Sequence, residues 1–386
     1  MNTKTSAKVM AIGLSVIAPL AQSATINLDN GTKLDIYGYA KLDLIYDVDA
    51  KMGPIVNYGA IRVDNQSGSD GHADLHVYET RLGFKTTTPK DFGNVETVVE
   101  GEFFGGGGGE WLLNHAYVKT DRILAGQTWS NFSNFIAKTP TIDFLGGVGQ
   151  TVLDQQPQLR YMQGGFSAAL EKPGNLGGKS KIFQEDPLGL SPTFLEEQNS
   201  YPDLTMQYKS NLASLDYGLS GVIRNVEIYN QVEDDEDSKI GYGLGLSVRN
   251  NFSETFSIQG SYVFGDGIGT YLYGNPAAVG FYDSGKSEVD TIKAHGATIG
   301  LSYNGLNNGQ INVAYGMVDA DYDDARSVGL DVSEEIETIS SIYVNYLWAD
   351  SYGINYGVEV GNHKSELADG RDGDATRIQA MVKYVF

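Results

Sequence analysis

Hydrophobic and polar residues alternate along many segments of the chain. In residues 34–47 (LDIYGYAKLDLIYD), every second position from Leu34 to Tyr46 is uncharged, whereas the positions between them include four charged residues. These are Asp35, Lys41, Asp43 and Asp47. A period of two residues places consecutive side chains on opposite faces of a β-strand. The same pattern in residues 376–386, and in many segments between, predicts an all-β fold.

The length of the alternating segments distinguishes a soluble sheet from a membrane barrel. Strands of soluble proteins usually have five or six residues, whereas these segments have about 9 to 14. Long, tilted strands that close into a barrel satisfy every backbone hydrogen bond where lipid excludes water. The uncharged face would then contact lipid, and a register shift of one residue would turn the charged face toward lipid at high cost. We therefore predict an antiparallel transmembrane β-barrel.

The chain contains about sixteen alternating segments. They begin near residues 34, 75, 95, 111, 123, 158, 165, 203, 214, 241, 255, 294, 310, 339, 353 and 375. Short turns alternate with longer loops between them, so we expect the short turns and both termini on the periplasmic side and the long loops outside. No internal repeat or domain boundary interrupts the pattern, and residues 24–386 are predicted to form a single barrel domain.

The first residues have the features of a bacterial secretory signal. Lys4 and Lys8 precede an apolar stretch at residues 9–20, and small residues follow at 21–23. The alternative is a membrane anchor, but about 12 apolar residues fall short of the roughly 20 that a spanning helix needs. We predict that residues 1–23 are a signal peptide that is cleaved after Ser23. Together with the barrel, this predicts the outer membrane of a Gram-negative bacterium.

The composition excludes several functions. The chain has no cysteine, which excludes thiolate-ligated zinc, iron–sulfur clusters and a cysteine nucleophile. The formal net charge is −22, so nucleic acid is not an expected partner, since phosphate neutralisation requires a basic surface. The five histidines show no H-E-x-x-H spacing, and no G-x-S-x-G motif occurs. The sequence therefore predicts no enzymatic activity, no catalytic residue, no metal and no cofactor.

One motif resembles a phosphate-binding loop. Residues 280–287 read GFYDSGKS, which fits the G-x-x-x-x-G-K-S pattern. Phosphate binding there requires a preceding buried strand and a following helix whose N-terminus meets the phosphates. The sequence predicts neither, and residues 280–287 fall in a long external loop, so we interpret the match as coincidence.

The loop after the fifth predicted strand is unusually apolar. A barrel of sixteen strands is too wide for wall side chains to fill, so a segment must fold inward to narrow it. Residues 131–156 contain Phe132, Phe135, Ile136, Ile142, Phe144, Leu145 and Val148. A loop of this composition needs a surface to pack on, which favours an inward-folded constriction loop over an ordinary surface loop.

Strand parity and this loop supply the candidate pore-lining charges. We hypothesise that Arg81 and Arg160 of the wall face Asp143 and Asp154 of the loop across the narrowest point. The alternative is that each charge only hydrates a polar interior. The predicted constriction and lumen residues are Lys41, Arg81, Lys85, Asp143, Asp154, Arg160, Arg224, Arg249 and Arg377.

The net charge and the candidate pore charges predict opposite ion selectivities. The net charge of −22 favours cations, whereas the arginines favour anions. The densest acidic run, residues 233–237, falls in an external loop more than about two screening lengths of 8 Å from mid-barrel. Charges inside a narrow opening are screened less, so we predict a weak preference for anions. The acidic run could bind lipopolysaccharide through divalent cations, and outer-membrane lipid and lipopolysaccharide are the expected surroundings.

Several short motifs resemble one protein family, the DcaP-like porins. They are residues 36–43 (IYGYAKLD), 124–132 (LAGQTWSNF), 140–146 (PTIDFLG), 157–161 (PQLRY) and 265–271 (GDGIGTY). The resemblance extends from the first predicted strand to the C-terminus. It implies a homotrimeric general-diffusion porin with sixteen strands per subunit, and a preference for small anionic or dicarboxylate solutes.

The predicted function is an outer-membrane porin, a passive diffusion channel for small hydrophilic solutes. A substrate-selective monomeric channel is the alternative within transport, and saturable uptake of one compound would identify it. A plugged adhesin or structural barrel would instead show no conductance. An outer-membrane hydrolase would need Ser, His and an acid clustered near the outer rim, which the sequence does not indicate.

Overall fold

The computed structural model describes residues 24–173, 181–184, 193–230, 235–307 and 309–386. The predicted signal peptide, residues 1–23, lies outside the described residues, as do Glu233 and Asp234 of the acidic run.

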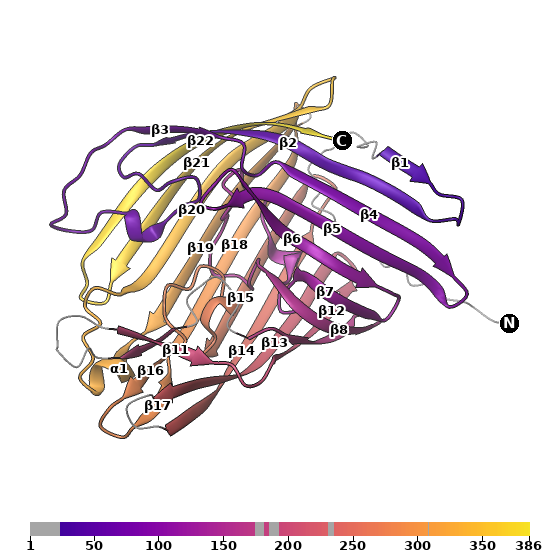
Figure 1. The fold of residues 1–386 in the computed structure, drawn as a ribbon. Coiled ribbons are helices and arrows are strands. Elements are labelled where there is room, and N and C mark those ends of the chain that lie inside the picture. The colour runs from indigo at the N-terminus through magenta and orange to yellow at the C-terminus, as the bar shows by residue number, and fades with distance from the viewer. Residues whose placement is uncertain (1–23, 174–180, 185–192, 231–234, 308) are drawn as a thin grey trace.

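Sixteen of the described strands close into an antiparallel barrel (Figure 1). They are β2 (Lys33–Asp47), β4 (Arg81–Lys90), β5 (Gly93–Gly105), β6 (Glu110–Lys119), β7 (Ile123–Trp129), β8 (Gln155–Gln163), β9 (Phe166–Glu171), β12 (Asp203–Leu212), β13 (Leu215–Asn230), β14 (Asp235–Asn251), β15 (Phe256–Asp266), β18 (Lys293–Leu306), β19 (Gly309–Asp321), β20 (Ile336–Ala349), β21 (Ile354–Leu367) and β22 (Asp372–Val385). The barrel closes where β2 pairs with β22, from Tyr39 opposite Val385 to Asp47 opposite Arg377. The prediction of a barrel of about sixteen strands is confirmed.

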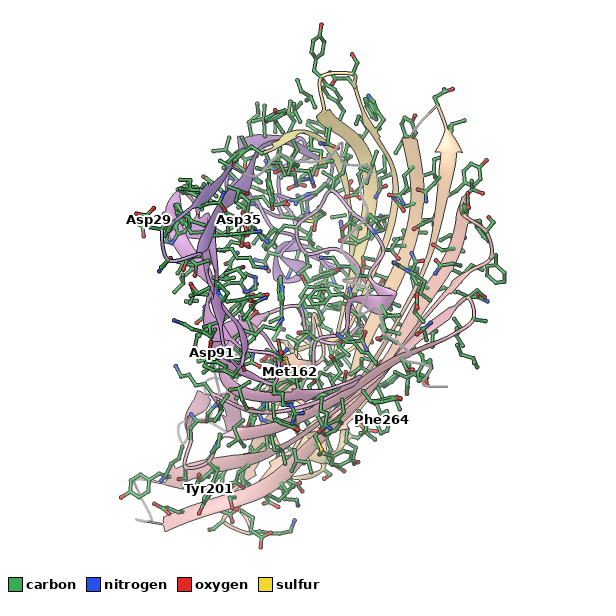
Figure 2. All side chains as sticks on the ribbon, turned by 90° about the vertical axis from the view of Figure 1, so that its right-hand side faces the viewer. Asp29, Asp35, Asp91, Met162, Tyr201 and Phe264 are labelled. Carbon is green, nitrogen blue, oxygen red and sulfur yellow. The ribbon has the colours of Figure 1, made fainter. Side chains whose placement is uncertain are left out.

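The two faces of the barrel differ as the alternation predicts. On β2, Leu42, Leu44 and Tyr46 are exposed, whereas Lys41 and Asp43 are buried. Large hydrophobic side chains are exposed at alternate positions of the other strands as well, for example Leu244 and Leu246 on β14. Side chains project from both the inner and the outer face of the wall (Figure 2). The outer face is therefore apolar and the inner face polar, which is the arrangement that lipid requires.

The second predicted barrel strand differs from the prediction, because two strands, β3 and β4, pair with different parts of β2. β3 (His72–His76) pairs with residues 43–47 of β2, and β4 pairs with residues 33–39. Between them, Lys41 N donates a hydrogen bond to Thr80 Oγ1 (3.1 Å), and this hydroxyl donates to Lys41 O (3.2 Å). A side chain thus replaces the backbone ladder at Lys41. The alternation at residue 75 therefore marked β3, and the barrel strand proper begins at Arg81.

The long loops contain short elements that the sequence did not predict. They are β10 (Lys181–Gln184), β11 (Thr193–Gln198), β16 (Gly280–Asp283), β17 (Glu288–Thr291), the 3-10 helices η1 (Tyr58–Ala60), η2 (Phe135–Ala137) and η3 (Gly269–Tyr271), and α1 (Asp323–Ser327). A further strand, β1 (Ala24–Asn27), precedes the barrel and pairs with β2. The P-loop-like residues 280–287 form β16 and the turn that leads to β17, so the motif is followed by a strand and not by a helix. In the part of the chain that the structure describes, no helix has the length and apolar character needed to cross a bilayer.

A buried hydrophobic cluster joins four loops of the described residues. Its members come from residues 48–71, 130–154, 267–292 and 322–335, and from inner positions of the neighbouring strands. They include Met52, Phe132, Val148, Tyr271 and Tyr322. In Figure 1, α1, β16 and β17 lie at the end of the barrel opposite β1 and the C-terminus. The loops at that end are therefore packed together by burial of apolar surface.

Candidate functional site

Residues 130–154, which we call loop A, connect the fifth barrel strand, β7, to β8. Glu171 of β9 holds the beginning of loop A, because its carboxylate accepts hydrogen bonds from Ser130 Oγ (2.8 Å) and from Asn131 N (2.5 Å). A few residues later, Asn134 Oδ1 accepts a hydrogen bond from Ile136 N (3.1 Å) and caps η2. The path of loop A is thus fixed from its first residue by side chains that satisfy its backbone.

The middle of loop A is fixed by the inner faces of β20 and β21. Glu359 accepts hydrogen bonds from the backbone N–H groups of Ile142 (2.9 Å) and Asp143 (2.8 Å). Asn345 Nδ2 donates to Pro140 O (2.9 Å). Glu359 is itself almost fully buried, so its charge is stabilised mainly by these donors. On the other side of the barrel seam, Lys41 Nζ donates to Ile142 O (3.2 Å).

The earlier part of loop A contacts the inner faces of β12, β14 and β15. Gln207 Nε2 donates to Ser133 O (2.7 Å), and Arg249 Nη2 donates to Lys138 O (2.8 Å). Gln259 Nε2 donates to Thr139 Oγ1 (2.9 Å). The close approach also requires a glycine in the wall, since a Cβ at Gly300 of β18 would lie 1.7 Å from Thr139 Oγ1. Loop A therefore contacts inner-face residues from β12 round to β22, a wall that is rich in amide and hydroxyl side chains.

The wall formed by β2, β4 and β5 instead carries a cluster of ion pairs. Arg81 pairs with Glu100 (3.2 Å) and Glu102 (2.6 Å), and Lys85 pairs with Glu96 (3.3 Å). Lys41 contacts both Asp43 (3.1 Å) and Glu79. The side chains of Lys85 and Arg81 are 37% and 20% exposed, whereas the amide and hydroxyl side chains under loop A are almost fully buried. Water therefore reaches the inner face along this charged wall.

The ion pair made by Asp143 differs from the hypothesis. Arg377 Nη1 of β22 lies 3.1 Å from Asp143 Oδ2, and Arg377 Nε lies 2.7 Å from Asp47 Oδ1. Arg81 is instead held by the two glutamates of β5. The reason is that Glu359 of β21 fixes the Asp143 backbone beside β22, the strand that pairs with β21, and this brings the Asp143 carboxylate to Arg377.

The other two members of the hypothesised set have separate hydrogen-bond partners. Arg160 of β8 donates to Gln158 Oε1 (2.8 Å) and to Trp129 O (2.6 Å). Asp154 accepts a hydrogen bond from Gln155 N (3.2 Å), and no ion pair of Asp154 is found among the described residues. Among the described residues, therefore, no ion pair joins Arg81 or Arg160 to Asp143 or Asp154.

Two further predicted residues, Arg224 and Arg249, lie on the inner faces of β13 and β14. Arg224 of β13 is buried, with Nε 3.6 Å from Asp203 Oδ2. Arg249 of β14 contacts loop A through Lys138 O, as described above. Arg224 thus pairs with a buried carboxylate of β12, and Arg249 binds the backbone of loop A.

Sequence reasoning did not single out Glu359 or Lys138. Glu359 is the only carboxylate at an inner position of β21, and strand parity could have identified it. Burial lowers the pKa of Lys138, opposed by the charge of Glu79 and reinforced by those of Arg81 and Lys41. The charges of Glu79, Arg81 and Lys41 thus act on Lys138 in loop A, and no ion pair of Lys138 is found in the described residues. No sequence period could have revealed that position.

The candidate chemistry of the site is electrostatic. Burial raises the pKa of Asp154, which favours its uncharged form. Within the described residues, no group of three or more His, Asp or Glu side chains is arranged to hold a metal ion. Fixed charges, aromatic rings and amides thus come together along loop A and the inner face of the barrel.

Known proteins with related sequences or folds were compared with the chain. A family described as DcaP outer membrane protein matches residues 10–386. The outer membrane channel DcaP of Acinetobacter baumannii has a similar structure, with a TM-score of 0.77 and 24% identity over 94% of this chain and 100% of that chain. OmpT of Vibrio cholerae, an outer membrane protein solved in a trimer form, gives 0.55 and 11% over 92% and 99% of the two chains.

OmpF of Salmonella typhi in complex with daunomycin has a TM-score of 0.54 and 10% identity over 94% of this chain and 100% of that chain. At these identities the solved structures establish the shared fold. No curated protein matches the sequence.

Proposed function

The chain belongs to the family of DcaP outer membrane proteins and is a Gram-negative outer-membrane protein, and from this premise we propose that it is a passive, water-filled channel for small hydrophilic solutes. One observation carries the proposal. The inside of the closed barrel has a charged wall on β2, β4 and β5 that stays partly accessible to water, whereas the outside is apolar. The similar structure from Acinetobacter baumannii is described as a channel, which supports the same function here. We propose no chemical step.

We propose that loop A folds into the lumen and constricts it. Its hydrogen bonds to Gln207, Gln259 and Asn345 support a course along the inner faces of β12 to β21. Loop A meets the wall formed by β2, β4 and β5 at Lys41, whose Nζ donates to Ile142 O, and at Phe104, whose ring centroid lies 4.4 Å from that of Phe144. Beside these contacts, a solute would pass between loop A and the part of the wall that carries Arg81 and Lys85, where the charges of Glu79 and Arg81 act on Lys138.

We further propose a weak preference for anions, with dicarboxylates as the expected class. The charged wall does not supply this preference, since its three cations, Arg81, Lys85 and Lys41, share five carboxylates. Lys138 and Arg160 have no ion pair among the described residues. Their charges are not cancelled at short range, and inside a narrow opening they are weakly screened, so they should determine the sign of the selectivity.

A homotrimer is part of the proposal. The support comes from the trimer form of the similar OmpT structure and from the resemblance of the sequence motifs to trimeric porins. Cross-linking of the native membrane protein, followed by electrophoresis, measures the number of subunits directly. A single cross-linked species of three subunits is the expected result.

Recordings from the purified protein in planar lipid bilayers test the channel. We expect stepwise conductance increases and, in a salt gradient, a reversal potential of the sign that indicates anion preference. Absence of conductance from a correctly folded barrel would overturn the channel and favour a plugged barrel. Saturable uptake of one compound would instead identify a substrate-selective channel.

A further inference from the structure

A second loop, residues 267–292, pairs with loop A, and we call it loop B. Three backbone hydrogen bonds join the two loops. Gly149 N donates to Tyr273 O, Tyr273 N donates to Gln150 O, and Val152 N donates to Tyr271 O, each at 2.9 Å. Thr151 and Leu272 form the antiparallel bridge at the centre of this ladder. Loop A is therefore held by loop B as well as by the barrel wall.

Tyr271 fastens loop B to the wall at the place where loop A begins. Its hydroxyl donates to Asp203 Oδ2 of β12 (2.9 Å) and lies 3.4 Å from Glu171 Oε2 of β9. Glu171 is the residue that also binds the first two residues of loop A. The Tyr271 side chain is 1% exposed, so this hydroxyl has no water to replace its carboxylate partner.

The ring of Tyr271 makes further contacts. It meets Phe132 of loop A edge-on, with 5.6 Å between the ring centroids, and the Arg224 guanidinium lies 5.7 Å from its centroid. A second tyrosine of loop B, Tyr273, donates from its hydroxyl to Leu145 O in the middle of loop A (2.6 Å). Loop B thus contacts loop A at its beginning, its middle and its end.

The opposite side of loop A lies directly against the wall. Gly149 has a φ of +83°, and a Cβ there would lie 2.2 Å from Met317 O of β19. A Cβ at Gly316 of β19 would lie 2.2 Å from Val148 O. Residues 148–152 are therefore enclosed between loop B and the backbone of the barrel, and they cannot leave the wall unless loop B moves.

We propose that Tyr271 is a positioning residue for the constriction: through Asp203 and Glu171 it holds loop B, and loop B presses loop A against the wall so that the passage stays open. The inference rests on the proposed function, because it assumes that loop A borders the passage. Loss of the Tyr271 hydroxyl should release loop A into the passage and produce closures.

The experiment is single-channel recording of Tyr271→Phe in planar bilayers. We expect frequent transitions to lower conductance levels and a reduced mean conductance, with unchanged heat-modifiable electrophoretic mobility of the folded barrel. Tyr322→Phe is the matched control, since it removes another buried hydroxyl, which donates to Ile336 O at the start of β20 (3.4 Å). A Tyr271→Phe channel with an unchanged or larger stable conductance would overturn the proposal.

A reversible cross-link distinguishes bracing from general destabilisation. The chain has no cysteine, so Thr151→Cys with Leu272→Cys introduces the only pair of thiols. The two positions form a non-hydrogen-bonded antiparallel pair, where the Cα atoms are about 4.5 Å apart, close enough for a disulfide. In the Tyr271→Phe background, oxidation should restore steady conductance and reduction should abolish it again. Closures that persist after verified oxidation would contradict the proposed role of loop B in holding loop A.

The two proposals fail in different ways. If the unmodified protein shows no conductance at all, the proposed channel function is wrong, whatever Tyr271 does. If the unmodified protein conducts and Tyr271→Phe matches it, the channel stands and the brace is wrong.

Discussion

Arg377 of β22 binds Asp143 of loop A, with 3.1 Å between Arg377 Nη1 and Asp143 Oδ2. The same guanidinium binds Asp47 of β2 through Nε (2.7 Å) and donates to Gly53 O (2.6 Å). It therefore connects loop A, the loop after β2 and the seam where the barrel closes. All three charged side chains are almost fully buried, so each depends on the others for its solvation.

Removal of this arginine should destabilise the protein strongly. Arg377→Met leaves two buried carboxylates without their cation, which typically costs about 3–5 kcal/mol. We expect a lower unfolding temperature, measured by the heat-modifiable mobility of the barrel. Lys364→Met is the control, because its pair with Asp372 is about half exposed and such pairs contribute about 0–1 kcal/mol. Equal effects of the two substitutions would contradict the anchoring role.

Ion selectivity should respond differently to the wall charges. Arg81→Ala leaves Glu100 and Glu102 unpaired, and Arg160→Ala removes a cation that has no ion pair among the described residues. The double variant should therefore shift the reversal potential in a salt gradient toward cations, whereas Glu100→Gln with Glu102→Gln should shift it toward anions. Lys239→Ala at an exposed site should leave it unchanged. An unchanged reversal potential in both double variants would mean that permeating ions do not pass along the wall that carries these charges.

Loop A should loosen when Glu359 is lost. Glu359→Ala removes the acceptor of two backbone N–H groups, and hydrogen bonds to charged groups contribute about 1.5–3 kcal/mol each. We expect faster cleavage of loop A by added protease in the folded, detergent-solubilised protein. Glu366→Ala on the same strand, at a position where the side chain is 40% exposed, serves as the control. Cleavage at the same rate in all three proteins would argue against this anchor.

A charged substitution on the outer face should destabilise the barrel by an amount that depends on its depth in the membrane. Leu246 of β14 is 45% exposed and lies near the middle of the strand's apolar face, so Leu246→Arg should cost about 2–4 kcal/mol of folding free energy in lipid. Ile240→Arg, nearer the loop end of the same strand, should cost about 0–1 kcal/mol. Reversible unfolding in lipid vesicles measures both values. A larger cost at Ile240 than at Leu246 would mean that Leu246 does not lie nearer the centre of the membrane than Ile240.

Asp154 should make stability depend on pH. Burial raises its pKa above the ordinary value of 3.8, so the folded protein binds this proton more tightly than the unfolded chain. Its contribution is favourable below the ordinary pKa and is lost as the pH rises through the higher, folded value. Asp154→Asn should therefore raise the free energy of unfolding at neutral pH, with a smaller difference below pH 3.8. Equilibrium unfolding at both pH values checks this expectation.

The sequence predicted the barrel well because its signal is local. Alternation along residues 34–47 assigns each side chain to lipid or to the interior without knowledge of any other strand. The same logic located most strands to within a few residues. The predicted strand start was wrong at residues 77–80, where the Thr80 hydroxyl replaces backbone pairing to Lys41. Such a local interruption of the pairing does not change the alternation of the sequence, so the pattern could not reveal it.

The candidate site was predictable only in part. The apolar composition of residues 131–156 singled out loop A, and strand parity selected the inner arginines. Neither signal could say which arginine meets Asp143. Loop B was interpreted as an external loop, although Tyr271 and Leu272 are almost fully buried against loop A. Its short strands and helices depend on contacts with other loops, so their own sequences did not reveal them.

The sequence by itself therefore determined the all-β fold and the face of the wall on which each side chain of a strand lies, since a period of two residues is a property of neighbouring positions. Only the tertiary structure decided that Asp143 pairs with Arg377, 234 positions away, and that Tyr271 reaches Asp203 and Glu171. The physical reason is that irregular loops carry no period. Their paths are set by which buried charges, amides and glycines the closed barrel brings within reach.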